Sequence, residues 1–327
     1  MTFNRRHLLA LGASALPLLH GTVQAQAFPS RSLRIVVPFA AGGPVDTLAR
    51  TLAGRLGTEL GQPVIIDNKG GAATIIGTDN VVKSPPDGYS LLMTGAGGRT
   101  ILPAVANLPY DPARDLLPVS RVASSPQIFV VSTQLAAKGV TSLKALVAWA
   151  KANPGKLNVG SVGAGTITSL VGDLFKREAG IQAVDVPFRG GAPAVMALLA
   201  GEIDFLSADV AAVIPNIQAK KLVGLAITGP KRVSDLPDVP TVVESGFPSL
   251  IAVNVYCLYA PANTPSDTVM KLNQAVSTAL KHPELQAQYA KAGMQAESSS
   301  PQALEKYLSD EAGKWQPLAR ALGVRIN

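Results

Sequence analysis

The chain has 327 residues, of which 47% are hydrophobic and 16% are charged, with a formal net charge of +7. This composition is that of a globular protein of roughly two domains and excludes an intrinsically disordered chain. The small positive charge and an aromatic content of 5% do not indicate a nucleic-acid partner, because such binding needs strong basic patches or many stacking rings.

The reactive side chains argue against catalysis. Cys257 is the single cysteine, which excludes an intramolecular disulfide and a cysteine-based zinc site. The histidines are His7, His20 and His282, and the last precedes a proline at a predicted helix end. A Ser-His-Asp triad and a histidine-ligated metal are therefore not expected. No phosphate-binding GxxxxGK[ST] motif is present either, so we expect binding without a metal or cofactor.

The first 27 residues have the pattern of a secretory signal peptide. Residues 1–7 are basic and include two adjacent arginines, residues 8–19 are apolar, and Ala25 and Ala27 form an A-x-A cleavage signal. The arginine pair is also typical of the twin-arginine route. A buried N-terminal helix is the alternative, but no capping residue opens it. We expect an exported chain that begins near Phe28.

After residue 28, short apolar segments alternate with segments of helical periodicity, which is typical of α/β sheets covered by helices on both faces. We expect strands over 33–38, 64–66, 91–93, 157–161, 183–187, 203–207 and 222–227. We expect helices over 45–60, 142–152, 166–179, 192–200, 210–219, 265–281, 283–292 and 301–320. The continuous apolar strands predict parallel pairing.

Two longer β-rich segments, 119–133 and 251–260, interrupt this alternation and bracket a complete set of strand–helix units. A chain that leaves one lobe, builds a second and returns needs two crossing segments. We therefore predict a two-lobed α/β fold, with 28–126 and 252–327 in lobe 1 and 127–251 in lobe 2. Ligands of such lobes bind beyond the carboxyl ends of the strands.

Two loops between a strand and a helix contain glycines and could bind an anion at a helix start. The first contains Phe39, Gly42 and Gly43 and leads to Asp46; a plain turn is the alternative, with Asp46 as a dipole partner. The second runs from Ser161 through Gly165 to Thr166, and Thr166 could equally be a helix cap.

Three further residues stand in comparable loops. Arg189 could pair a carboxylate, with solvent exposure as the alternative. Asp209 precedes a predicted helix that it could cap. Arg99 lies in the loop 94–100, where plain exposure is again the alternative.

An ordered set of motifs adds to these loops. Along the chain these are PFAAGGPVD, PPDGYSLLM, LPYDPARDLLPVS, ANPGKLNVGSVGAGT, VPFRGGAPAV, LAGEID, LPDVPTVVESGFP and LYAPANTP. The set resembles the Bug family of periplasmic solute-binding receptors, also called TctC-like tripartite tricarboxylate transporter receptors, over essentially the whole mature chain.

The resemblance implies a Venus-flytrap-like fold with the crossing segments as its hinge, in a monomeric periplasmic protein. It implies a ligand that is a di- or tricarboxylate, an acidic amino acid or an aromatic acid. One carboxylate would be held, partly through water, between the two glycine-containing loops, by Phe39, Gly42, Gly43, Asp46, Ser161, Gly165 and Thr166. Arg189 and Asp209 are further candidate ligand contacts.

The chain departs from the family pattern at several positions, including Arg99, where histidine is frequent, and Ser169, where histidine is also frequent. The loop around Arg99 is expected to face the distal part of the ligand, which weakly favours a diacid. The partners would be membrane permease components resembling TctA and TctB. Two alternatives stay open: a sensory receptor that signals to a membrane kinase, and an exported enzyme with Asp46 or Asp209 as general base.

Overall fold

The computed structural model describes residues 28–162, 166–188, 190–323 and 325–326. The strands are β1 (Leu33–Val37), β2 (Val64–Asn68), β3 (Ser90–Gly95), β4 (Leu116–Ser132), β5 (Leu157–Ser161), β6 (Ala183–Pro187), β7 (Phe205–Asp209), β8 (Leu222–Ile227), β9 (Val253–Pro261) and β10 (Gln295–Ala296). The α-helices are α1 (Pro44–Leu60), α2 (Ile75–Val82), α3 (Gly97–Thr100), α4 (Leu102–Val105), α5 (Thr133–Ala136), α6 (Leu143–Ala152), α7 (Ile167–Ala179), α8 (Gly191–Ala200), α9 (Val210–Gln218), α10 (Ser266–Leu280), α11 (Pro283–Lys291) and α12 (Pro301–Ala321), and the 3-10 helices are η1 (Ala72–Thr74) and η2 (Pro248–Leu250).

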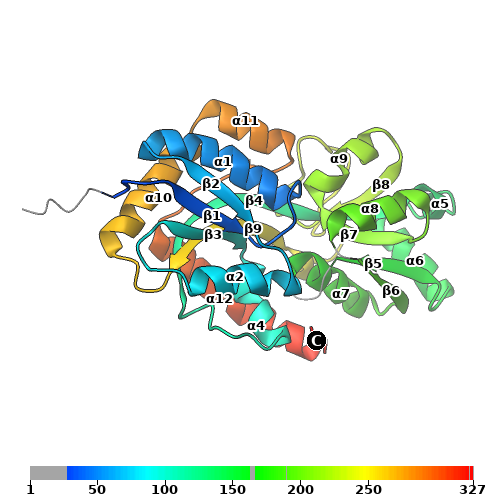
Figure 1. Ribbon diagram of the computed structural model, residues 1–327. Coiled ribbons are helices and arrows are strands. Elements are labelled where there is room, and N and C mark those ends of the chain that lie inside the picture. Colours follow the sequence, from blue (N-terminus) through cyan, green and yellow to red (C-terminus); the bar gives the residue numbers. More distant parts are fainter. Residues whose placement is uncertain (1–27, 163–165, 189, 324, 327) are drawn as a thin grey trace, which may run out of the picture.

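One group of strands follows the order β2-β1-β3-β9-β4, with β10 on the edge of β4 (Figure 1). Alternate residues of β1 face opposite sides, as in any strand. Ile35 and Val37 pack in the cluster that contains α1, α10 and α11, whereas Val36 packs with Val81 of α2 and Leu308 of α12. Helices therefore cover both faces of this sheet.

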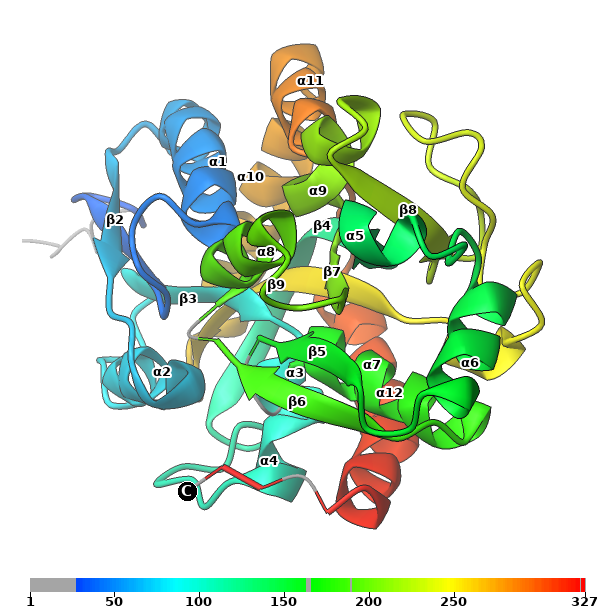
Figure 2. The ribbon, with the colours of Figure 1, turned by 90° about the vertical axis from the view of Figure 1, so that its right-hand side faces the viewer.

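The second group follows the order β4-β7-β5-β6, with β8 also paired to β4. Here Phe129 and Phe205 face the cluster built with α6 and α7, while Val130 and Leu206 face α8 and α9. In Figure 2 these helices enclose the green strands nearest the viewer. The same alternation thus produces a second sheet that is buried on both sides.

β4 and β9 connect the two groups. β4 pairs with β9 as far as Pro126↔Val253 and with β7 from Gln127↔Asp209 onward. Thr228 ties the crossing together, because its N–H donates to the Gln127 carbonyl at 2.8 Å and its carbonyl accepts from the Ala252 N–H at 3.0 Å. The two segments that bear these contacts are the crossing segments that the sequence predicted.

The expected helices and strands are confirmed, with ends that shift by up to three residues. Strands β4 and β9 are antiparallel to their neighbours, as is β8 to β4, so each sheet is mixed rather than parallel. Strand β7 covers Phe205–Asp209 rather than 203–207. The short helices α2 to α5, the 3-10 helices η1 and η2 and the two-residue strand β10 were not predicted, since they are too brief for a periodic pattern.

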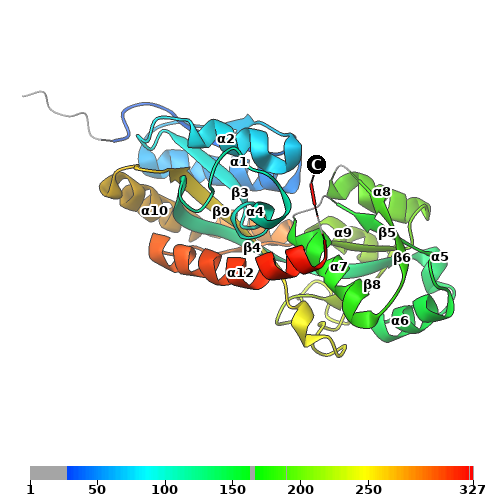
Figure 3. The same ribbon diagram turned by 90° about the horizontal axis from the view of Figure 1, so that it is seen from below.

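A hydrophobic cluster joins the two groups along one side. Trp315 and Ala319 of α12 and Leu102 of α4 belong to the same buried cluster as Leu170 and Phe175 of α7. Figure 3 shows α12, in red, running beneath the first sheet and ending beside α7. We call this contact between α12, α3–α4 and α7 the seam.

Candidate functional site

The carboxyl ends of strands from both sheets meet at Asn254 of β9. A Cβ on Gly95, at the end of β3, would lie 3.1 Å from Asn254 Oδ1. Asp209, at the end of β7, lies 3.5 Å from Asn254 Nδ2. Because β1 runs parallel to β3 and β5 runs parallel to β7, the loops after all four strands border the same region. This is where open α/β sheets bind ligands.

Asp46 closes the loop that follows β1. Its Oδ2 accepts from the Gly42 N–H at 2.8 Å and from Arg50 Nε at 2.9 Å, and its Oδ1 accepts from Asn68 Nδ2 at 3.0 Å. The Asn68 amide also donates to the Phe39 carbonyl at 3.2 Å. Both carboxylate oxygens are thus occupied by bonds that fix the loop.

Electrostatics keep this carboxyl group ionised. Burial opposes ionisation, but the hydrogen bonds from Arg50, the Gly42 N–H and Asn68 hold the pKa of Asp46 below its usual 3.8. A carboxylate of lowered pKa with both oxygens engaged is a poor general base. Asp46 therefore orients Gly42 and the start of α1.

The loop after β5 places Thr166 as the cap of α7. Its hydroxyl oxygen accepts from the Ser169 N–H at 3.2 Å, and its backbone is extended. The Ser161 and Ser169 hydroxyl oxygens lie 3.3 Å apart, and the Ser161 carbonyl accepts from the Phe188 N–H at 2.8 Å. Ser161 and Thr166 thus flank one short loop at the helix start. The predicted contacts Gly165 and Arg189 lie outside the described residues.

Asp209 lies in a hydrogen-bonded group where the chain crosses. Gln127 Nε2 donates to Oδ1 at 2.6 Å, and the Tyr256 hydroxyl donates to Oδ2 at 3.4 Å. Burial raises the pKa of Asp209, and these hydrogen bonds together with that from Asn254 offset only part of the effect. Its side chain makes no capping bond to α9, so the helix-cap alternative is wrong.

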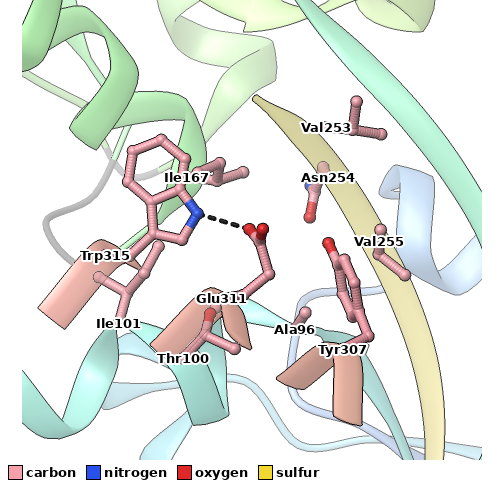
Figure 4. A pocket seen from close by; sticks show the side chains of 11 residues that line it. Ala96, Thr100, Ile101, Ile167, Val253, Asn254, Val255, Tyr307, Glu311 and Trp315 are labelled. Atoms are coloured by element: carbon pink, nitrogen blue, oxygen red, sulfur yellow. Dashed lines mark hydrogen bonds between the residues drawn. The ribbon is translucent and has the colours of Figure 1, made fainter. Parts of the chain in front are cut away.

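A small pocket of about 10 Å³ adjoins Asn254 at the seam (Figure 4). The pocket brings together α3, the first residue of α7, β9 and α12. In Figure 4 the polar ends of Glu311, Asn254 and Tyr307 turn toward its centre, and Trp315 Nε1 donates to Glu311 Oε2 at 2.5 Å. Pockets that enclose ligands usually exceed about 300 Å³. In this conformation the space is therefore too small for a typical ligand.

Arg99 is buried, so the alternative of plain solvent exposure is wrong, while its contact with a ligand stays a prediction. Its side chain is buried, with 7% exposure, and Nη2 donates to Glu305 Oε1 at 2.7 Å and to the Ala113 carbonyl at 3.2 Å. The ion pair with Glu305 of α12 uses Nη2, whereas Nη1 is buried without a hydrogen-bond partner among the described residues. The sequence could not show this, because Glu305 is 206 positions away.

Sequence reasoning also missed Asn68, Gln127 and Asn254, whose amides hold Asp46 and Asp209. All three lie in strands, which the sequence analysis treated as structural. A single sequence does not distinguish an amide that bonds to a distant residue from one that does not. The one available signal is a polar residue within an apolar run, as at Gln127, which is 0% exposed.

Comparison with known proteins identifies the chain. The profile described as tripartite tricarboxylate transporter family receptor matches residues 48–324. This chain belongs to that family. The receptor shares 32% sequence identity with the solved periplasmic binding protein BugD, over 91% of this chain and 99% of that one, at a TM-score of 0.82. The family consists of periplasmic binding proteins rather than enzymes, as expected.

Two further solved structures similar to the receptor contain small carboxylates. An R. palustris protein with adipate is 31% identical over 91% of this chain and 99% of that one, with a TM-score of 0.84. MatC from Rhodopseudomonas palustris, with bound malate, is 30% identical over 89% of this chain and 100% of that one, with a TM-score of 0.81. These likenesses confirm the mixed α/β periplasmic-binding-protein fold.

Within the described part of the receptor, no group of three or more His, Cys, Asp and Glu side chains is placed to hold a metal ion. None of the helices in the described ranges is long and apolar enough to cross a membrane.

Proposed function

We propose that the receptor captures a small organic carboxylate between its two lobes and presents it to permease components resembling TctA and TctB. The observation that carries this proposal is the convergence of two helix starts, α1 and α7, on the region at Asn254. Unpaired N–H groups at a helix start favour an anion. The malate and adipate bound by similar receptors have this chemistry.

In the proposed complex, one carboxylate lies between the loop of Phe39, Gly42 and Gly43 and the loop of Ser161, Gly165 and Thr166. Asp46 acts on the ligand indirectly, since its oxygens hold the first loop in place. Arg189 would contribute a positive charge from lobe 2, and Asp209 would line the bottom of the binding site. Arg99 is assigned to the packing of α12.

The moving parts follow from the crossing. We propose that residues 28–126 and 252–327 form lobe 1 and that 127–251 form lobe 2, because β4 changes partners between Pro126 and Gln127. The seam would lie on the same side of the receptor as the hinge between the lobes. When the lobes open, α1 and α8 would therefore move apart. We further propose that residues 1–27, which lie outside the described residues, are removed on export and that the mature receptor is a monomer.

A panel of carboxylates tests this function. A ligand at about 100 times its dissociation constant stabilises the folded state by roughly 2.7 kcal/mol, so malate, adipate or another di-, tri- or aromatic acid should raise the melting temperature by several degrees. The corresponding uncharged amides serve as controls. Mass spectrometry should recover the ligand unchanged, whereas turnover would favour the enzyme alternative. If no acid raises the melting temperature and purified receptor holds none, carboxylate capture is refuted.

Thr166→Val separates ligand binding from helix capping. Valine keeps the shape but removes the hydroxyl, so we expect a loss of about 1 kcal/mol in unfolding free energy. A lost hydrogen bond to a charged ligand should add about a ten- to hundredfold loss of affinity. Calorimetric titration and denaturant melts measure the two effects.

Ser142→Ala is the matched control, because Ser142 caps α6 by accepting from the Ala145 N–H at 3.1 Å. This variant should lose similar stability and keep its affinity. If Thr166→Val behaves like Ser142→Ala, Thr166 is a cap and not a ligand contact.

A further inference from the structure

Gln127 stands at the position where β4 changes partners. It is the first residue of β4 to pair with β7, directly after the last pair with β9. Its backbone is fixed on both sides, since the Gln127 N–H donates to Thr228 Oγ1 at 2.8 Å and its carbonyl accepts from the Thr228 N–H at 2.8 Å. The Thr228 hydroxyl also lies 2.6 Å from the Ala252 carbonyl. Three chain segments thus determine where the buried side chain points.

The Gln127 amide bonds at both of its ends. Its Oε1 accepts from Thr168 Oγ1 at 2.8 Å, and its Nε2 donates to Asp209 Oδ1 at 2.6 Å. Thr168 lies in the first turn of α7, two residues after the Thr166 cap. Asp209 immediately precedes α9. One fully buried amide therefore joins the starts of two helices of the proposed lobe 2.

Asp209 extends this chain of bonds to β9. Asn254 Nδ2 and the Tyr256 hydroxyl lie 3.5 and 3.4 Å from its oxygens, and Asn254 Nδ2 donates to the Tyr256 hydroxyl at 3.0 Å. Asn254 in turn lines the pocket at the seam together with Ile167, the first residue of α7. The bonds thus run from the start of α7 through Gln127 to residues beyond the crossing.

We propose that Gln127 is a positioning residue whose amide, by accepting from Thr168 and donating to Asp209, holds the starts of α7 and α9 in the arrangement that binds ligand. The proposal rests on the proposed carboxylate binding. No other group in the described structure satisfies Thr168 and Asp209 together through one side chain. An amide suits this place because it offers an acceptor and a donor on one planar group.

The direction of the hydrogen bonds makes the proposal testable. Gln127→Glu keeps size and the acceptor facing Thr168 but sets a second carboxyl group against Asp209. Two adjacent buried carboxyls share one proton and repel once both ionise. Tyr256 on β9 is the titratable neighbour in contact with Asp209 within the described residues; Gln127, Thr168 and Asn254 on the other contacting positions do not titrate.

Calorimetric titration with malate and with adipate between pH 5 and pH 8 tests the proposal. Gln127→Met, which removes both bonds, should bind about tenfold more weakly at every pH. Gln127→Glu should bind nearly as wild type at pH 5 and more than tenfold more weakly at pH 8. The double variant Q127E/D209N restores a donor opposite an acceptor with the direction reversed, so the pH dependence that distinguishes Gln127→Glu from wild type should disappear.

Asn273→Asp is the matched control, because the Asn273 amide donates to the Val119 and Ser299 carbonyls at 2.7 Å within lobe 1, away from these loops. It should lower stability without making affinity depend on pH. A measurement without ligand separates the positioning role of Gln127 from carboxylate capture. Amide hydrogen exchange at residues 170–172 and 213–214 should be faster in Gln127→Met than in wild type. If neither acid binds wild type, carboxylate capture fails for these probes while exchange still decides the role of Gln127. The proposal is overturned if exchange in Gln127→Met equals that of wild type, or if Gln127→Glu binds as tightly as wild type at every pH.

Discussion

Trp315→Ala should lower the free energy of unfolding by about 3–5 kcal/mol, the usual cost of removing a large buried aromatic side chain. Trp315 is 1% exposed and packs in the cluster that joins α12 to α7. The substitution also removes the indole N–H that donates a hydrogen bond to Glu311. Urea denaturation followed by circular dichroism measures the loss.

The second tryptophan, Trp149 of α6, provides the control. It is only half-buried, so Trp149→Ala should cost clearly less than Trp315→Ala. Trp149→Phe leaves Trp315 as the sole indole, and its fluorescence should shift on ligand binding because it lies where α12 meets α7. A cost below about 1 kcal/mol for Trp315→Ala would show that the seam does not stabilise the fold.

Asp46→Ala is expected to weaken carboxylate binding by about ten- to hundredfold, although Asp46 does not itself contact the ligand in the proposed complex. The substitution removes the acceptor shared by the Gly42 N–H, Asn68 and Arg50, so the loop after β1 loses the bonds that fix it. A hydrogen bond to a charged group contributes roughly 1.5–3 kcal/mol. Because the Arg50 side chain is largely exposed, solvent weakens its ion pair with Asp46. We therefore expect the loss of unfolding free energy to lie near the lower end of this range. Calorimetric titration and urea melts measure both quantities.

The pH dependence of this effect has a definite sign. Because the folded-state pKa of Asp46 lies below 3.8, its contribution to stability is present above that pH and is lost as the pH falls through the folded value. Asp46→Ala should therefore flatten the acid limb of the stability profile.

Asp115→Ala is the comparison variant, since Asp115 accepts from the Asp111 N–H at 2.9 Å and pairs with Arg114 in a different loop. It should change stability without changing affinity. Equal affinities for Asp46→Ala and wild type would mean that the loop after β1 does not hold the ligand.

Local pattern was sufficient for most of the fold. The strands over 157–161, 183–187 and 222–227 match β5, β6 and β8 residue for residue, because each is a short, mostly apolar segment between glycine-containing or charged stretches. The ends of α1 also carry residues that are typical of helix ends. Pro44 stands at its first position, and Gly61 takes a left-handed conformation at its C-cap. Family membership followed from motifs spread along the chain and is confirmed by the profile match.

The sequence by itself determined the order of strands and helices, the two crossing segments and the loops at which a ligand is expected. Only the tertiary structure decided what those loops contain. Asn68 reaches Asp46 across 22 positions, Gln127 reaches Asp209 across 82, and Glu305 reaches Arg99 across 206. Periodicity reports which face of an element is buried, whereas a hydrogen-bond partner or a raised pKa depends on which distant strands the fold brings together.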